Sequence, residues 1–121
     1  MAIQNILIVD DSKTETMFLT ELLQKNGYVV QSAESADAAM AYLLQNRPDL
    51  ILMDVVMPGQ NGFQLTRTIS RTPAYADIPI ILCTSKSQET DRVWGMRQGA
   101  SAYLTKPLDT TDLLTKIRML G

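Results

Sequence analysis

Short hydrophobic runs, several of them rich in β-branched residues, recur along the chain and are separated by longer segments with helical periodicity. Apolar runs without polar interruption are typical of strands that are buried on both faces of a sheet. The pattern predicts strands at residues 6–9, 28–30, 50–53, 78–82 and 103–104. Internal repeats and low-complexity tracts are absent from the sequence.

The segments between these runs carry signals for the start and the end of helices. Ser12 and Glu15 have the spacing of a capping box, and Asn26 with Gly27 ends the same segment. Helices are predicted at about residues 12–26, 35–46, 62–71 and 88–98, and from residue 109 onward. We expect the following side chains to face inward or to share one stripe: Phe63, Leu65 and Ile69 in the third helix, and Leu113, Ile117 and Leu120 in the last.

Alternation of five strands with five helices predicts an α/β fold with a doubly wound, five-stranded parallel sheet. Parallel neighbours need a helical crossover, which is right-handed, so helices cover both faces of the sheet. Ligands of such sheets bind at the carboxyl ends of the strands. The residues that follow each predicted strand are therefore the first candidates for a functional site.

Length and composition indicate one ordinary globular domain. A chain of 121 residues buries roughly two-thirds of its unfolded surface. A formal net charge of −2 argues against nucleic-acid or anionic-membrane partners. We expect a cytoplasmic protein, because the sequence has no apolar stretch of membrane-spanning length and its start lacks a secretory signal.

Two residue types narrow the chemistry further. The chain contains no histidine, which excludes histidine catalysis, histidine metal sites and a phosphohistidine carried by this chain. The single cysteine, Cys83, lies in an apolar run and is interpreted as a small buried hydrophobic residue.

Acidic residues gather where the predicted strands end. Asp10 and Asp11 follow the first strand and Asp54 follows the third, while Thr84 and Lys106 stand at the ends of the fourth and fifth. Two carboxylates 4 Å apart repel by about 4 kcal/mol at an effective dielectric constant near 20. A divalent cation would relieve this repulsion, and crowded oxygens are the ligands that Mg²⁺ prefers. The sequence therefore predicts a Mg²⁺ site at this edge.

The remaining residues of the cluster suit a phosphoryl group. An ionised Asp54 is already a nucleophile and needs no general base. The hydroxyl of Thr84 and the ammonium group of Lys106 are suited to hold phosphoryl oxygens, and phosphoryl transfer depends mainly on positioning and charge neutralisation. Ser85 is a further candidate for phosphate contact, while Ser12 is interpreted as a helix cap.

The motifs VDDS, LMDVVMPGQNG, LCTS and YLTKP, with intervals of 44, 30 and 22 residues between Asp10, Asp54, Thr84 and Lys106, resemble those of CheY-like response regulator receiver domains. The resemblance extends over residues 1–121, so the whole chain is expected to be one receiver without an output domain. It implies a flavodoxin-like fold with strand order 2-1-3-4-5. It also implies phosphorylation of Asp54 by a histidine kinase.

The resemblance implies roles for further residues. The backbone carbonyl of Val56 would complete the Mg²⁺ shell formed by Asp10, Asp11 and Asp54. Phosphorylation would draw Thr84 inward and let Tyr103 swing into the vacated space. The surface formed by the fourth helix, fifth strand and fifth helix would then change its affinity for a partner; its candidate residues are Lys86, Trp94 and Gly95. Gly95 is also expected to loosen the fourth helix, since glycine costs about 1 kcal/mol relative to alanine there.

Within the family, the segments MDVVMPGQNGFQ and QETDRVWGMRQGASAYLTKP are most similar to stand-alone receivers of type IV pilus twitching-motility systems, the PilH type. One alternative is a phosphate sink that drains a shared kinase. Another is a haloacid-dehalogenase-like phosphatase, which expects its second acid two residues after the nucleophile, whereas Asp10 and Asp11 are adjacent. A flavodoxin-like cofactor protein is disfavoured because two acids stand where a flavin phosphate would bind.

Overall fold

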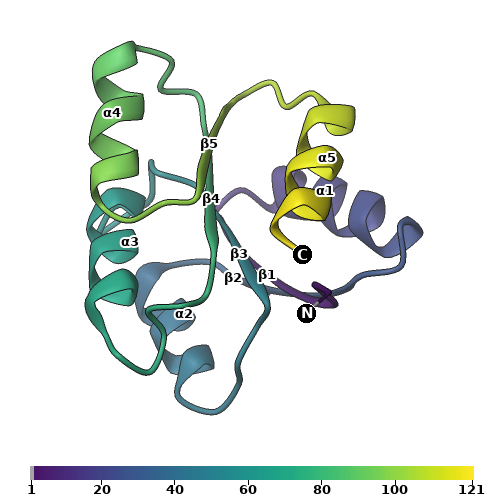
Figure 1. Cartoon of the computed structure of the whole chain (residues 1–121), viewed down its shortest axis with the longest axis horizontal. Helices are drawn as coiled ribbons and strands as arrows, with labels where there is room; N and C mark the ends of the chain where they lie inside the picture. The colour runs from purple at the N-terminus through teal and green to yellow at the C-terminus, as the bar shows by residue number, and fades with distance from the viewer. Residues whose placement is uncertain (1) are drawn as a thin grey trace.

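The computed structural model describes residues 2–121, in which strands and helices alternate as predicted (Figure 1). The strands are β1 (Asn5–Val9), β2 (Val29–Ala33), β3 (Leu50–Met53), β4 (Ile80–Thr84) and β5 (Ala102–Thr105). The helices are α1 (Lys13–Lys25), α2 (Ala36–Leu43), α3 (Gly62–Arg71), α4 (Glu89–Arg97) and α5 (Thr110–Leu120).

The strands form one parallel sheet with the order β2-β1-β3-β4-β5, which confirms the flavodoxin-like topology. Strand β1 pairs with β2 on one side and with β3 on the other. Because the order reverses at β1, the ends of β1 and β3 are neighbours although they are far apart in sequence. Val9, the last residue of β1, is in register with Met53, the last residue of β3.

Helices cover both faces of the sheet, α1 and α5 on one side and α2, α3 and α4 on the other (Figure 1). Alternate residues of each inner strand enter opposite cores: Ile6 and Ile8 pack with α1 and α5, whereas Leu7 and Val9 pack with α2 and α3. This two-sided burial explains why the strands are continuously apolar. Cys83 is buried in the first of these cores, as predicted.

Side chains at the helix starts satisfy backbone amides that the helix leaves free. Ser12 accepts a hydrogen bond from the Glu15 amide, Ser35 from the Ala38 amide and Asp109 from the Asp112 amide. Asn61 and Gln64 form a reciprocal capping box at the start of α3. Each of these helices follows a strand of the parallel sheet, so the capped starts lie at the carboxyl end of the sheet. The prediction that Ser12 is a cap is confirmed.

Several predicted boundaries were displaced. Strand β2 extends to Ala33 through the exposed polar residues Gln31 and Ser32, which pair with Leu7 and Ile8 of β1 at the edge of the sheet. Strand β4 begins at Ile80 instead of residue 78 and continues to Thr84. Helix α2 ends at Leu43, before the predicted residue 46. Leu113 and Ile117 are buried, but Leu120 lies 37% exposed at the end of α5.

Candidate functional site

Three carboxylates meet at the carboxyl end of the sheet, because β1 and β3 are adjacent and end at the same level. Asp10 and Asp11 follow β1, and Asp54 follows β3. One carboxylate oxygen from each of the three residues lies within 4.8 Å of the others. The structure therefore brings the acids into one cluster, as their positions after the strands predicted.

The three carboxylates of the cluster differ in their exposure to solvent. Asp10 is 4% exposed, Asp54 is partly buried, and Asp11 faces solvent. Asp10 is held in place on both oxygens: Oδ1 accepts a 2.9 Å hydrogen bond from the Ser12 amide, and Oδ2 accepts one of 3.1 Å from Lys106 Nζ. The hydrogen bond from the Ser12 amide was not predicted, since no pattern of side chains in the sequence marks a backbone donor.

Lys106 supplies a positive charge beside these carboxylates. Its Nζ lies 3.1 Å from Asp10 Oδ2 and 3.7 Å from Asp54 Oδ1, and its side chain is 16% exposed. Burial by itself lowers the pKa of Lys106, but the negative charges of Asp54 and Asp10 outweigh it and raise that pKa above its usual value. The side chain is therefore a permanent ammonium group at neutral pH.

Asp54 lacks full compensation for its charge. Burial raises its pKa above the usual aspartate value, and the nearby charge of Asp10 adds to this effect, while Lys106 and the Val55 amide act in the opposite direction. The Val55 amide donates a 2.9 Å hydrogen bond to Asp54 Oδ1. One lysine thus offsets only part of the repulsion within the cluster, and a further cation there would be stabilising.

The chain after Asp54 is fixed by Gly62 at the start of α3. The Gly62 amide donates a 2.8 Å hydrogen bond to the Val55 carbonyl. A Cβ atom at residue 62 would collide with the backbone carbonyl oxygen of Asp54. Only glycine permits this approach, so Gly62 helps to position the backbone of Asp54 at the end of β3. Gly62 was not predicted as part of the site, although a glycine directly after the helix cap Asn61 is visible in the sequence.

The neighbouring strands contribute a hydroxyl group and an aromatic ring. Thr84 is buried, and its Oγ1 accepts a 3.2 Å hydrogen bond from the Lys86 amide. The half-buried Tyr103 donates a 2.7 Å hydrogen bond from its hydroxyl to the Lys86 carbonyl. Burial, together with the charge of Asp91, raises the pKa of Tyr103 to about 12, so the phenol remains protonated. Thr84 and Tyr103 are therefore linked through one residue, Lys86.

The remaining candidates lie around this centre. Ser85 and Lys86 are exposed, Trp94 is 49% exposed on α4, and the Val56 side chain is 56% exposed in the loop after Asp54. Gly95 is different: it is buried in α4 against the sheet. Leu82, Tyr103 and Phe63 lie close to it, so Gly95 does not itself present an exposed surface to a partner.

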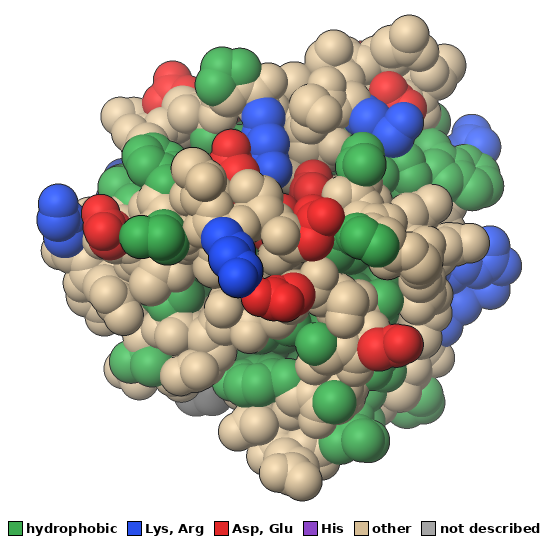
Figure 2. Space-filling view, turned by 180° about the vertical axis from the view of Figure 1, so that it is seen from behind, with side chains coloured by type: hydrophobic (Ala, Val, Ile, Leu, Met, Phe, Trp, Pro, Cys, Tyr) green, Lys and Arg blue, Asp and Glu red, His purple; other side chains and the backbone are tan. Residues whose placement is uncertain are grey.

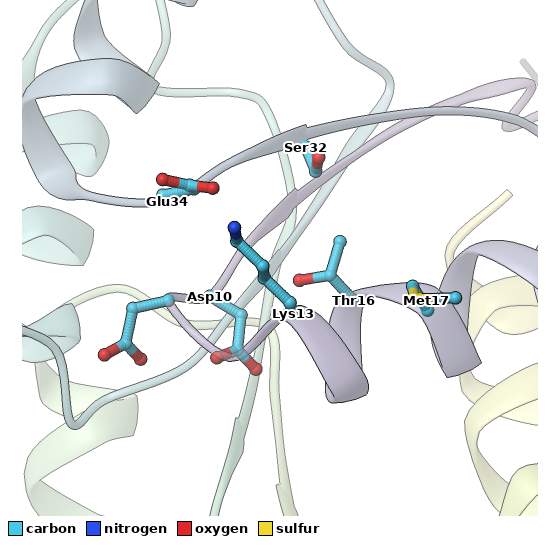
Figure 3. A pocket seen from close by; sticks show the side chains of 7 residues that line it. Asp10, Lys13, Thr16, Met17, Ser32 and Glu34 are labelled. Atoms are coloured by element: carbon cyan, nitrogen blue, oxygen red, sulfur yellow. The ribbon is translucent and has the colours of Figure 1, made fainter.

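A cavity of about 240 Å³ opens beside the acidic cluster, between α1 and the end of β2 (Figure 3). In addition to Asp10 and Asp11, it is lined by Lys13, Thr16, Met17, Ser32 and Glu34. Figure 3 shows the Lys13 side chain extending toward Glu34. Ser32 of β2, which the sequence patterns did not mark, lies on its wall. Figure 2 shows acidic side chains gathering near the centre of one face, several with a basic neighbour.

The donor set fits a divalent cation of the Mg²⁺ type. Three carboxylates within 4.8 Å offer hard oxygen ligands on a solvent-accessible side, where Asp11 is exposed. Mg²⁺ is commonly bound through one or two carboxylates while it retains several waters. The cluster is consistent with such a site.

None of the helices within residues 2–121 combines the length and the apolar character that a membrane span requires.

Comparison with known proteins agrees with this geometry. The family model of the response regulator receiver domain matches residues 6–118. Protein PilH of Pseudomonas aeruginosa is 53% identical over 112 residues, which are 93% of each chain. The phosphate regulon transcriptional regulatory protein PhoB of the same organism is 36% identical over 95% of this chain, which spans about half of PhoB.

Solved structures show the same fold. The chemotaxis protein CheY4 of Vibrio cholerae superposes with a TM-score of 0.91 at 29% identity, covering 99% of this chain and all of that one. A response regulator from Chloroflexus aurantiacus gives a TM-score of 0.93 at 30% identity, covering 98% of this chain and 97% of that one. Membership of this family implies a signalling module that has no separate substrate, with a histidine kinase as its phosphodonor. The chain therefore belongs to the response regulator receiver domain family.

Proposed function

We propose that this protein accepts a phosphoryl group on Asp54 from a histidine kinase, in a reaction that depends on Mg²⁺, and that phosphorylation alters its α4–β5–α5 surface. The observation that carries the proposal is the cluster of Asp10, Asp11 and Asp54, whose oxygens lie within 4.8 Å while Lys106 contacts two of the three acids. Repelling acids at a strand end are costly, and phosphoryl chemistry gives them a use.

Each side chain has a distinct part in the transfer. Asp10, Asp11, Asp54 and the carbonyl of Val56 are the residues that would hold Mg²⁺, which when bound neutralises charge on the phosphoryl oxygens. A carboxylate oxygen of Asp54 forms the new P–O bond as the P–N bond to the kinase histidine breaks. The Lys106 ammonium, the Thr84 hydroxyl and Ser85 hold the phosphoryl oxygens.

The hydrogen bonds around Lys86 support the switching part of the proposal. Thr84 Oγ1 accepts from the Lys86 amide, and the Tyr103 hydroxyl donates to the Lys86 carbonyl. Movement of Thr84 toward a phosphoryl group would break the first bond and release the loop that holds the second. Tyr103 would then turn inward, and the exposed residues Lys86 and Trp94 on the adjoining surface would move with it.

We further propose that the protein acts as a single receiver over residues 1–121 and takes part in the control of type IV pilus twitching motility. The support is the similarity to PilH over 93% of both chains. A receiver that acts without an output domain must respond through direct contact with another protein, for which the α4–β5–α5 surface is the candidate. A phosphate sink would share the chemistry and lack that contact.

The proposed acceptor is tested by incubating the protein with acetyl phosphate, with and without Mg²⁺, and measuring intact mass. The proposal predicts a Mg²⁺-dependent gain of about 80 Da in the wild type that is lost in Asp54→Ala. Asp37→Ala, which removes an exposed carboxylate in the first turn of α2, is the matched control and should gain the same mass. A gain that persists in Asp54→Ala would contradict the assignment.

A further inference from the structure

Helix α4 is attached to the domain in a different way from its neighbour α3. Of the ten residues of α3, five are buried, including the large side chains of Phe63, Leu65 and Ile69. Of the nine residues of α4, only Gly95 is buried, and its apolar residues Val93, Trp94 and Met96 are between 40% and 49% exposed. Gly95 is therefore the one residue of α4 that is fully covered by the rest of the domain.

Three side chains from three different elements converge on that glycine. A Cβ atom at residue 95 would lie 2.8 Å from Leu82 Cδ1, 3.0 Å from Tyr103 Cδ2 and 3.1 Å from Phe63 Cε1. These distances are shorter than ordinary van der Waals contact, so the space of the missing side chain is already filled. The ring of Tyr103 thus packs directly beneath the α4 backbone, and a shift of the ring changes the surface on which the helix rests.

The carboxyl end of α4 is anchored more firmly than its amino end. Ser70 of α3 donates a 2.7 Å hydrogen bond to the carbonyl of Gln98, the residue that caps α4, and Gly99 packs closely against the Ser70 side chain. Residues 85–88, which lead into the helix, and its first two residues, 89 and 90, are all exposed. Displacement at Gly95 is therefore expected to tilt the amino-terminal half of α4 about its fixed carboxyl end.

We propose that Gly95 is a positioning residue that transmits the position of the Tyr103 ring to α4. The absence of a side chain leaves ring and helix backbone in direct contact, so the two move together. An alanine at this position would displace Leu82, Tyr103 and Phe63 both before and after phosphorylation. The position of α4 would then no longer depend on whether Asp54 is phosphorylated. This inference rests on the proposed function, because it concerns how the phosphorylated site reaches the α4–β5–α5 surface.

The test compares wild type and Gly95→Ala by intact mass after acetyl phosphate and Mg²⁺, and by amide hydrogen exchange in α4 before and after phosphorylation. Gly95 lies away from the acidic cluster, so we expect phosphorylation within about twofold of wild type. We expect the phosphorylation-dependent change in α4 exchange to fall by about threefold or more. Met96→Ala, an exposed change in the next residue of α4, should retain the wild-type response.

A second variant separates transmission from simple packing. Leu82→Val removes Cδ1, the atom nearest to the added methyl group, so the double variant Gly95→Ala/Leu82→Val should recover part of the α4 response. The double variant also replaces Gly95→Ala in the test if the single variant fails to fold. A full α4 response in phosphorylated Gly95→Ala would overturn the inference. Failure of wild type itself to be phosphorylated would instead count against the proposed function, so the two failures are distinguishable.

Discussion

The two ends of the sheet hold carboxylates in opposite conditions. At the amino end, Asp49 Oδ2 accepts hydrogen bonds from the backbone amides of Gln4, at 3.0 Å, and Asn5, at 2.9 Å. These bonds lower the pKa of Asp49 below its usual value. At the carboxyl end, burial raises the pKa of Asp54 instead, and Asp10 adds to the rise. The surroundings thus favour the ionised form of Asp49 and disfavour the ionised form of Asp54.

The difference separates a structural carboxylate from a functional one. Asp49 is paired with amides that would otherwise be free at the start of β1, so its charge supports the fold. Asp54 is placed near two other acids with Lys106 as its cationic partner, which leaves part of its charge uncompensated. A local arrangement that reduces stability is expected where a site binds a cation and a phosphoryl group.

Removal of Lys106 should produce the largest effect on stability. Lys106→Met keeps a side chain of similar length and leaves Asp10 and Asp54 without their cation, so we expect unfolding free energy to fall by about 2 kcal/mol in EDTA. Mg²⁺ should restore much of the loss, because it supplies positive charge at the same place. Urea denaturation with and without Mg²⁺ measures both quantities.

The control for this prediction is Lys116→Met on α5. Lys116 Nζ lies 3.4 Å from Asp112 in an i,i+4 pair at the surface, where such pairs contribute only about 0.3–0.5 kcal/mol. Its loss should be small and unaffected by Mg²⁺. Equal losses of unfolding free energy in the two lysine variants would show that Lys106 stabilises the acidic cluster no more than a surface ion pair does.

Asp49→Asn should have a smaller effect in the same direction, about 1 kcal/mol at neutral pH, because a neutral amide oxygen accepts the two backbone hydrogen bonds less strongly than a carboxylate. The folded-state pKa of Asp49 is lowered, so its contribution is fully present above the unfolded-state value of 3.8 and is lost as pH falls through the folded-state pKa. Stability measured from pH 6 down to about pH 3 should therefore decline less in Asp49→Asn than in wild type. Parallel pH profiles would disprove the assignment.

The strands and the acidic cluster follow from sequence because they depend on strong local signals, whereas the strand order was predicted only from the resemblance to receiver domains. Buried strands such as β3 are uniformly apolar, and the residues after parallel strands must meet at one edge. Strand β2 was misplaced because its exposed residues Gln31 and Ser32 pair with β1 through backbone hydrogen bonds that hydrophobicity does not mark.

Features that depend on tertiary packing were outside the reach of sequence patterns. Gly95 was interpreted from helix propensity as a loosening residue on the surface, whereas its burial against Leu82 and Tyr103 makes it a contact point. The Tyr103–Lys86 hydrogen bond and the fit of Gly62 against Asp54 likewise join residues whose proximity arises only after the sheet has formed.

The most direct test of the contrast between Asp49 and Asp54 is the unfolding free energy of wild type and Asp54→Asn, measured in EDTA and in Mg²⁺. We expect Asp54→Asn to be more stable than wild type in EDTA by about 1 kcal/mol, because the substitution removes a crowded and partly buried charge. Mg²⁺ should stabilise wild type more than the variant, since binding to the folded state raises stability. A variant less stable than wild type in EDTA, with an equal gain from Mg²⁺, would contradict both expectations.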